Sequence, residues 1–268
     1  MKKIFSKSFS MPYFIIVIIF ISAIIDLYEK RGKFKSFIKS KVQKKEISVK
    51  QETLPSVRGD NYWAKEIMNG GYILHFRHAE RDKWVDVQMY DLLESDLHNN
   101  GKEESRYAEN DYFANAVCLN KKGKIQAKAM GESLNHIGFP VGVVYSTPSC
   151  RARQTADLAF DGYDKLSRIL LYGDSGGRGL FNEDVKDHVN KLKELYSNIN
   201  IEKGKNAIIS SHGDVLNCGM FINEDCPDYE GLRLGEGGFW IIRQSEKGLI
   251  LEYKFYNFYK FNRIFYNR

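Results

Sequence analysis

The sequence has few prolines and lacks the short motifs that identify several common enzyme classes. It contains five prolines and four cysteines, and no two cysteines have the CxxC spacing of a zinc or thioredoxin-like site. No GxxxxGK(S/T) loop and no HExxH pair occurs, so P-loop nucleotide hydrolysis and zinc proteolysis have no support. The scarcity of proline, beside 17 Phe and 16 Tyr residues, indicates a globular chain rather than a disordered one.

Positive charge is concentrated at the start of the chain and is lacking elsewhere. Residues 1–50 hold 12 Lys and Arg against 3 Asp and Glu, a net charge of +9, whereas the whole chain carries +6. Residues 51–268 therefore carry −3, which removes the main support for a nucleic-acid-binding domain. The even number of cysteines permits disulfides if the domain is exported and requires none if it is not.

The leader contains an uncharged apolar run of 15 residues, from Met11 to Ile25, that ends at Asp26. With the next residues it predicts a thin transmembrane anchor over 11–28, flanked by a basic segment (1–10) and a lysine-rich tether (29–60). No good cleavage site follows, although a cleaved signal peptide and a buried core helix remain alternatives. The remaining 61–268 are long enough for one compact catalytic domain.

The orientation of this anchor stays open. Eight Lys and Arg residues lie between positions 30 and 45, directly after the apolar run. The charge-bias rule slightly favours a cytoplasmic location for that side, and hence for the domain. The same cluster can lie on anionic headgroups or act as a solvated tether, so a periplasmic or extracellular domain is the alternative.

The globular part alternates strand and helix patterns. This alternation predicts an α/β three-layer sandwich, with a mostly parallel central sheet flanked by helices. The expected helices cover residues 61–68, 123–137, 151–160 and 185–196, and the expected strands cover 72–76, 141–145, 169–172 and 207–210. An antiparallel hairpin is expected from 239–243 and 249–255. Residues 81–117 read as an insertion that either forms a lid over the site or is a passive loop.

Three strand ends carry residues suited to binding and attacking an anion. Arg77 and His78 follow the first apolar strand, and His212 follows the buried strand at 207–210. Arg151 follows the turn at 146–149, where the start of a helix favours an anion. A lone strand-end histidine is more often structural than catalytic. Parallel strands, however, bring their carboxyl ends to one edge, so these groups are expected to converge.

With these motifs the chain resembles the histidine phosphatase superfamily, which includes phosphoglycerate mutase. The resemblance extends from Trp63 to about Leu216 and is carried by residues 70–79, 118–127, 138–156 and 211–213. Ala79 replaces the usual glycine of the Arg-His-Gly motif. This Arg-His-Ala variant is similar to the subgroup of small bacterial phosphatases rather than to the mutases.

The resemblance implies phosphomonoester hydrolysis through a phosphohistidine on His78. Arg77, Arg151 and His212 would neutralise the phosphoryl oxygens, with no metal and no other cofactor. The proton donor is expected beyond the strand that follows the Arg151 helix. Asp174 lies nearest to that place, and Glu183 and Glu80 are competitors, although each is equally a candidate for an ordinary surface acid.

The substrate class is not specified by the sequence. A phosphorylated small molecule, a lipid-linked phosphate at the bilayer surface and a phosphoprotein are all compatible partners. A phosphoglycerate mutase-like phosphotransferase and an inactive membrane-bound phospho-ligand binder are the alternative functions. Residues 173–177 spell the serine-protease sequence Gly-Asp-Ser-Gly-Gly, but the strand–helix alternation opposes an all-β protease fold, and the segment reads as a loop.

Overall fold

The computed structural model describes residues 58–83, 117–171 and 185–266. The chain divides into two units, Met1–Val57 and Arg58–Arg268, and every described residue belongs to the second. The predicted basic start, the 11–28 anchor and nearly all of the 29–60 tether lie outside the described residues. Within the described ranges, no helix combines the length and the apolar character needed to cross a bilayer.

The described strands form one mixed sheet in the order β3-β2-β4-β1-β5-β6. The parallel part contains β1 (Ile73–Arg77), β2 (Val141–Ser146), β3 (Lys165–Leu166) and β4 (Asn206–Ser211). The antiparallel part is the hairpin of β5 (Phe239–Ser245) and β6 (Gly248–Phe255), which joins the sheet alongside β1. The mostly parallel sheet and its terminal hairpin are thus confirmed.

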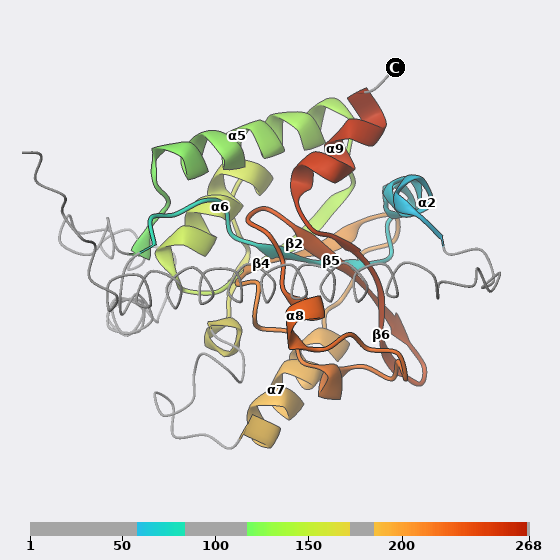
Figure 1. The fold of residues 1–268 in the computed structure, drawn as a ribbon. Coiled ribbons are helices and arrows are strands. Elements are labelled where there is room, and N and C mark those ends of the chain that lie inside the picture. Colours follow the sequence, from blue (N-terminus) through green and yellow to red (C-terminus); the bar gives the residue numbers. More distant parts are fainter. Residues whose placement is uncertain (1–57, 84–116, 172–184, 267–268) are drawn as a thin grey trace, which may run out of the picture. The chain divides into compact units, whose positions relative to one another are not determined.

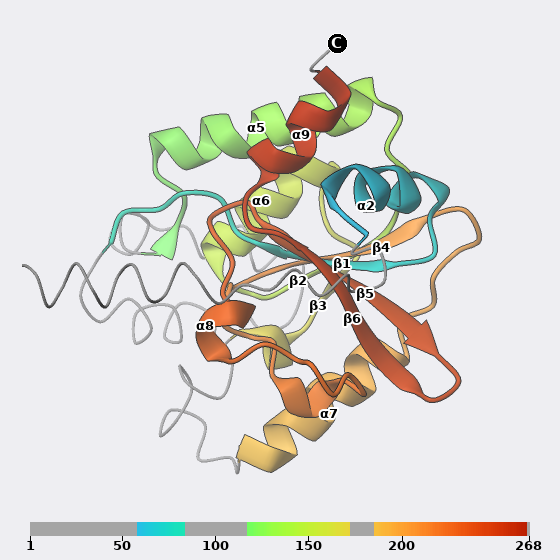
Figure 2. The same cartoon turned by 45° about the vertical axis from the view of Figure 1, so that its right-hand side comes forward.

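Helices cover both faces of the sheet and give the predicted three layers (Figures 1 and 2). One face carries α2 (Asp60–Glu66), α5 (Lys121–His136), α6 (Cys150–Phe160) and α9 (Phe258–Tyr266). The other face carries α7 (Val185–Ser197) and the short α8 (Tyr229–Leu232). Each face of the sheet has its own apolar core. Phe76 lies in the core on the first face, and Leu192 lies in the core on the second.

The central strand β1 is buried because alternate side chains enter the two cores. Leu74 and Phe76 pack in the core beneath α5 and α6, whereas Ile73 faces the core beneath α7. The chain enters β1 through Gly70, which has a φ of +76°. A Cβ there would lie 2.4 Å from the Gly204 carbonyl carbon, so only glycine permits this approach. β1 is therefore fixed between β4 and β5, with its carboxyl end open.

One predicted strand is wrong. The apolar run at 169–172 falls mainly in the 3-10 helix η3 (Arg168–Leu170), and the short edge strand β3 precedes it. Leu170 and Leu171 are fully buried. A short apolar run reports burial but does not distinguish a buried turn from a strand. Here the Ser211 hydroxyl donates to the Leu170 carbonyl at 2.6 Å and satisfies it outside the sheet.

All four cysteines form disulfides, Cys118–Cys150 and Cys218–Cys226. The first cross-link joins the residue before Leu119 to the first residue of α6, directly next to Arg151. The second closes a short loop around the 3-10 helix η4 (Cys218–Met220). The sequence left open whether disulfides form, and the structure contains both.

Candidate active site

Two predicted site histidines meet at the carboxyl ends of neighbouring strands. β1 and β4 are parallel, with Arg77 in register with Ser211, so His78 and His212 leave the sheet side by side. The backbone N–H of His78 donates to the Ser211 carbonyl at 2.8 Å. The two imidazole rings lie edge to face, with centroids 5.4 Å apart. The predicted convergence of these strand ends is therefore what the fold produces.

Arg151 joins the pair from the first turn of α6. It is 2% exposed, and its Nη2 lies 3.2 Å from Nδ1 of His212. Thr155 strengthens this turn, because its hydroxyl donates to the Arg151 carbonyl and accepts the backbone N–H of Ala79. Through Thr155, α6 is thus hydrogen-bonded to the residue that follows His78.

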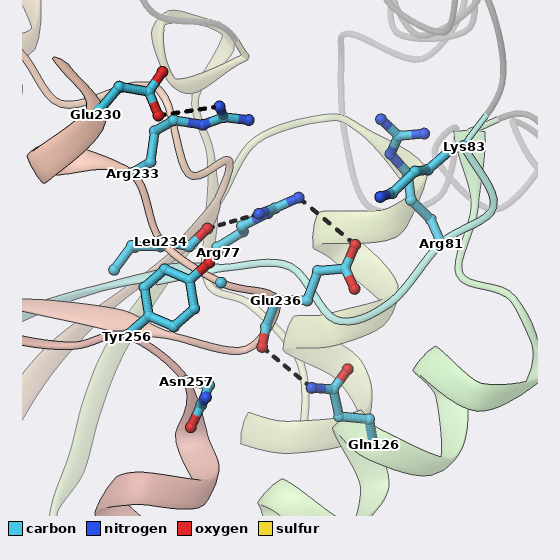
Figure 3. A pocket seen from close by; sticks show the side chains of 11 residues that line it. Arg77, Arg81, Lys83, Gln126, Glu230, Arg233, Leu234, Glu236, Tyr256 and Asn257 are labelled. Carbon is cyan, nitrogen blue, oxygen red and sulfur yellow. Dashed lines mark hydrogen bonds and ion pairs between the residues drawn. The ribbon is translucent and has the colours of Figure 1, made fainter. Parts of the chain in front are cut away.

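Arg77 reaches the same region from the end of β1, but its guanidinium points to one side. Its aliphatic stem passes beside Gly213, where a Cβ would lie 2.8 Å from the Arg77 Cδ. Its Nη1 donates to the Leu234 carbonyl at 2.6 Å, and its Nη2 lies 3.6 Å from Glu236 (Figure 3). All four predicted groups therefore gather at one sheet edge, with Arg77 on its outer side.

Hydrogen bonds define which nitrogen of His78 can react. Nδ1 lies 2.7 Å from the Ala79 carbonyl, which can only accept a hydrogen bond. Nδ1 therefore carries the proton, and Nε2 keeps the lone pair that a nucleophile needs. Burial, then the charges of Arg151 and Arg77, hold the pKa of His78 well below its ordinary value. The ring stays neutral at physiological pH.

His212 has the opposite tautomer. Its Nδ1 faces Arg151, which can only donate, so Nδ1 accepts and Nε2 carries the proton. Burial and the Arg151 charge also hold the pKa of His212 well below its ordinary value. His78, with a lone pair on Nε2, and His212, with a proton on Nε2, thus lie together as neutral rings beside two guanidiniums. This set suits attack on an anionic centre.

A third histidine lies beneath the pair. His75 is fully buried in β1, and its Nε2 lies 2.8 Å from the His212 carbonyl. Since a carbonyl only accepts, Nε2–H donates there, and Nδ1 accepts from the Tyr196 hydroxyl at 2.6 Å. His75 therefore connects α7 to the backbone of His212. The sequence showed this residue inside the first strand, but strand periodicity assigns it no partner.

Burial lowers the pKa of His75 from 6.5 to about 4, so acid should destabilise the fold through this residue. The unfolded chain binds a proton near pH 6.5 while the folded chain does not, so this stability is present above pH 6.5 and is lost towards pH 4. The loss is about 3 kcal/mol. Between pH 7 and pH 4, the free energy of unfolding of a His75→Gln variant is expected to fall by about 3 kcal/mol less than that of the wild-type protein, as measured by urea denaturation. An equal loss in both proteins would contradict this assignment.

The residues at 118–127 brace the loop after His78. Asn120 caps α5 by accepting the Gly123 N–H, and its amide donates to Glu80 and Asp82. The backbone N–H of Glu80 donates to Gln126 at 2.9 Å. A Cβ on Gly123 would lie 1.8 Å from the Glu80 carbonyl oxygen, so glycine is required there. These motif residues therefore position the loop that follows His78.

The predicted proton donor is not located. Asp174 and its competitor Glu183 lie outside the described residues, as does most of the 81–117 insertion. Glu80, the other competitor, accepts the Asn120 amide at 3.3 Å. The structure adds Asp214, two residues after His212. Burial raises the pKa of Asp214, and the charges of Arg151, Arg77 and Arg233 act against that rise.

Asp214 was missed because it follows the strand end in a loop, where periodicity gives no direction. Its proximity to His212 in the sequence was the available signal. Within the described ranges, no group of three or more His, Cys, Asp or Glu side chains could hold a metal ion. The described site residues offer an anion-binding set of guanidiniums and imidazoles instead.

Comparison with known proteins supports the resemblance seen in the motifs. Residues 114–169 match the model of the histidine phosphatase superfamily (branch 1). This stretch contains the Cys118–Gln126 motif, β2 and the Arg151 helix, so the resemblance predicted from the sequence is confirmed there. The Arg-His-Ala variant lies outside the matched residues. A search of curated protein sequences found no match.

Among the similar solved structures, three illustrate the range, and two of them are phosphatases by name. The product of the open reading frame Rv3214 from Mycobacterium tuberculosis is 18% identical, with 67% of this chain and 94% of that chain covered and a TM-score of 0.39. The protein histidine phosphatase SixA with tungstate is 15% identical (68% and 95% covered, TM-score 0.40). A phosphoserine phosphatase from Entamoeba histolytica with 3-phosphoglyceric acid is also 15% identical (68% and 95% covered, TM-score 0.41).

Proposed function

We propose that this chain hydrolyses phosphomonoesters through a phosphohistidine on His78. One observation carries the proposal: the lone-pair nitrogen of His78, the N–H of His212 and the guanidinium of Arg151 gather at one sheet edge. The family-model match supports the same chemistry. A neutral imidazole beside fixed cations is suited to attack a phosphate dianion, because the cations offset the charge repulsion of the approach.

In the first step, Nε2 of His78 forms a bond to phosphorus while the bond from phosphorus to the ester oxygen breaks. The leaving oxygen takes a proton from a carboxylic acid. In the second step, water attacks phosphorus and loses a proton to the same carboxylate. The N–P bond breaks, and inorganic phosphate leaves. The Ala79 carbonyl supports the charged imidazole through Nδ1–H in the intermediate.

The equatorial phosphoryl oxygens gain stabilisation from side chains alone in this proposal. Arg151 and Arg77 supply two guanidiniums, and His212 supplies its Nε2–H. Arg151 also fixes the His212 tautomer through their 3.2 Å contact. We propose that no metal ion takes part, since these groups provide the positive charge that a metal provides in other phosphotransferases.

Leaving groups of different basicity test the chemistry and identify the donor. Wild-type protein is expected to hydrolyse both p-nitrophenyl phosphate and ethyl phosphate. If Asp214 is the donor, Asp214→Asn lowers kcat/KM for ethyl phosphate about 10²-fold or more, because ethoxide must be protonated. The same variant affects p-nitrophenyl phosphate far less, since p-nitrophenolate leaves without a proton.

Asp174→Asn and Glu80→Gln are the matched variants in that assay. Equal losses on both substrates for Asp214→Asn would reject Asp214 as the donor, and a selective loss for Asp174→Asn would establish the donor predicted from the sequence. Wild-type protein that binds phosphate but releases none from either ester would instead favour the inactive binder. Transfer of the phosphoryl group back to substrate, without release, would favour the mutase.

The predicted membrane anchor over 11–28 is part of the proposal, and the two disulfides bear on its orientation. Disulfides persist in oxidising compartments, so Cys118–Cys150 and Cys218–Cys226 favour an exported domain, against the lysine bias. Alkaline phosphatase fused after Arg268 is then expected to be active in cells. An inactive alkaline phosphatase fusion, together with fluorescence from a fluorescent protein fused at the same position, would place the domain in the cytoplasm. Small phosphorylated molecules, lipid-linked phosphates and phosphoproteins all remain within the proposed substrate range.

A further inference from the structure

A hollow of about 860 Å³ opens beside Arg77. Three segments and Gln126 of α5 form its walls. The segments are residues 77–83 from the end of β1, residues 230–236 around the end of α8, and residues 256–257 between β6 and α9. Among Arg77, His78, Arg151 and His212, only Arg77 lines it. In Figure 3 the Arg77 side chain lies in the middle of this space, so it borders both the phosphoryl site and the hollow.

The wall of the hollow opposite residues 77–83 is held in place by hydrogen bonds. The Leu234 carbonyl accepts from Arg77, and the Gly235 N–H donates to the Tyr256 carbonyl at 2.8 Å. The Gly237 N–H donates to the His78 carbonyl at 3.2 Å. The wall is therefore attached directly to the strand end that carries His78, and its position is coupled to the site.

Positive charge dominates the lining. Arg77, Arg81, Lys83 and Arg233 face two carboxylates, Glu230 and Glu236, which leaves a net charge of +2. The carboxylates lie by Arg233 and Arg77, at 3.5 and 3.6 Å, in ion pairs that are partly exposed and therefore weak. Figure 3 shows Arg81 and Lys83 together on the side of the space opposite Arg233 and Glu230.

The charge of Arg81 connects this cationic side with His78. After burial, Arg151 and Arg77, the charge of Arg81 also lowers the pKa of His78, so Arg81 lies within electrostatic range of the attacking ring. When the phosphate of an ester lies at His78, the organic part of that ester therefore lies close to Arg77 and the hollow. The volume is in the range of small-molecule sites, and Tyr256, which is 50% exposed, offers a flat apolar surface.

We propose that this hollow binds a second anionic group, a phosphate or a carboxylate, of a substrate whose transferred phosphate lies at His78. The inference rests on the proposed phosphatase function and narrows it to phosphomonoesters with a second negative charge. Arg81 and Lys83 bind the second anion, and Tyr256 packs against the body that joins the two anionic groups. Guanidinium and ammonium donors form charge-assisted hydrogen bonds with either anion.

Matched substrate pairs test this with the full-length protein. Fructose 1,6-bisphosphate against fructose 6-phosphate tests a second phosphate, and phosphoglycolate against ethyl phosphate tests a carboxylate. We expect kcat/KM to be about tenfold or more higher for the doubly anionic member of at least one pair, as one or two charge-assisted contacts allow. Sodium chloride is expected to reduce the ratio.

The double variant Arg81→Gln/Lys83→Gln is expected to bring that ratio close to 1. The control Lys203→Gln/Lys247→Gln removes the same charge from exposed positions away from the hollow and is expected to keep the ratio. Ratios near 1 in both pairs, with normal turnover of p-nitrophenyl phosphate, would overturn the second-anion site alone. A ratio unchanged in the double variant would also overturn it. No turnover of any ester would overturn the phosphatase function and this inference with it.

Discussion

His78→Ala is expected to lower kcat/KM for p-nitrophenyl phosphate by at least about 10⁴-fold, because removal of a covalent nucleophile eliminates the two-step route. His78 is 3% exposed, and its Nδ1–H is committed to the Ala79 carbonyl. The remaining cations can still bind phosphate, so binding of inorganic phosphate should persist. This separation of binding from turnover distinguishes a lost nucleophile from a collapsed site.

The measurement combines steady-state turnover with a quench of the labelled intermediate. A phosphoryl group on imidazole nitrogen is labile to acid and stable to alkali, and wild-type protein is expected to carry it during turnover. His136→Ala is the matched control, because His136 is exposed at the end of α5 and is neither one of the four site groups nor in the lining of the hollow. Turnover or label that survives in His78→Ala would show that another residue is the nucleophile.

Arg151→Ala is expected to cost about 10²- to 10³-fold in kcat/KM, the usual effect of removing one preorganised donor to transition-state charge. Arg151 also donates to His212 Nδ1 at 3.2 Å. Without it, the His212 tautomer is no longer fixed, and the Nε2–H that we propose as donor to a phosphoryl oxygen is no longer guaranteed. One substitution thus removes a charge and a correctly placed proton.

The pH profile gives Arg151→Ala a readout that misfolding does not produce. The Arg151 charge lowers the pKa of His78 and of His212, in each case after burial. Its removal raises the pKa of His78, so the acid limb of kcat/KM should move to higher pH. Arg151→Lys keeps the charge but not the planar fork, and should restore the acid limb more than the rate. An acid limb at the same pH in wild type and Arg151→Ala would contradict this coupling.

The sequence was sufficient for the elements whose pattern reflects burial. β1, β2, β4 and the terminal hairpin were predicted because their apolar residues alternate or run together at strand length. The convergence of His78 and His212 followed from the parallel register of β1 and β4. Arg151 was placed correctly because the start of a helix after a strand end lies at the same edge.

Other features depend on contacts between distant segments, which the sequence pattern does not encode. The direction of the Arg77 guanidinium is set by the Leu234 carbonyl, 157 residues away, and the role of His75 by Tyr196, 121 residues away. Disulfide pairing cannot be derived from cysteine spacing alone. The 3-10 helix η3 was missed for a similar reason, since Ser211 satisfies its Leu170 carbonyl from another strand.

The two segments that flank residues 84–116 are held by contacts with the starts of α5 and α6. On one side, Glu80 and Asp82 accept the Asn120 amide; on the other, Cys118 is cross-linked to Cys150 at the start of α6. Because both flanking segments are held, insertions, deletions and substitutions can accumulate within residues 84–116 during evolution while His78 and His212 keep their spacing. We expect relatives of this protein to differ most in that stretch, so new specificities would arise there without new chemistry.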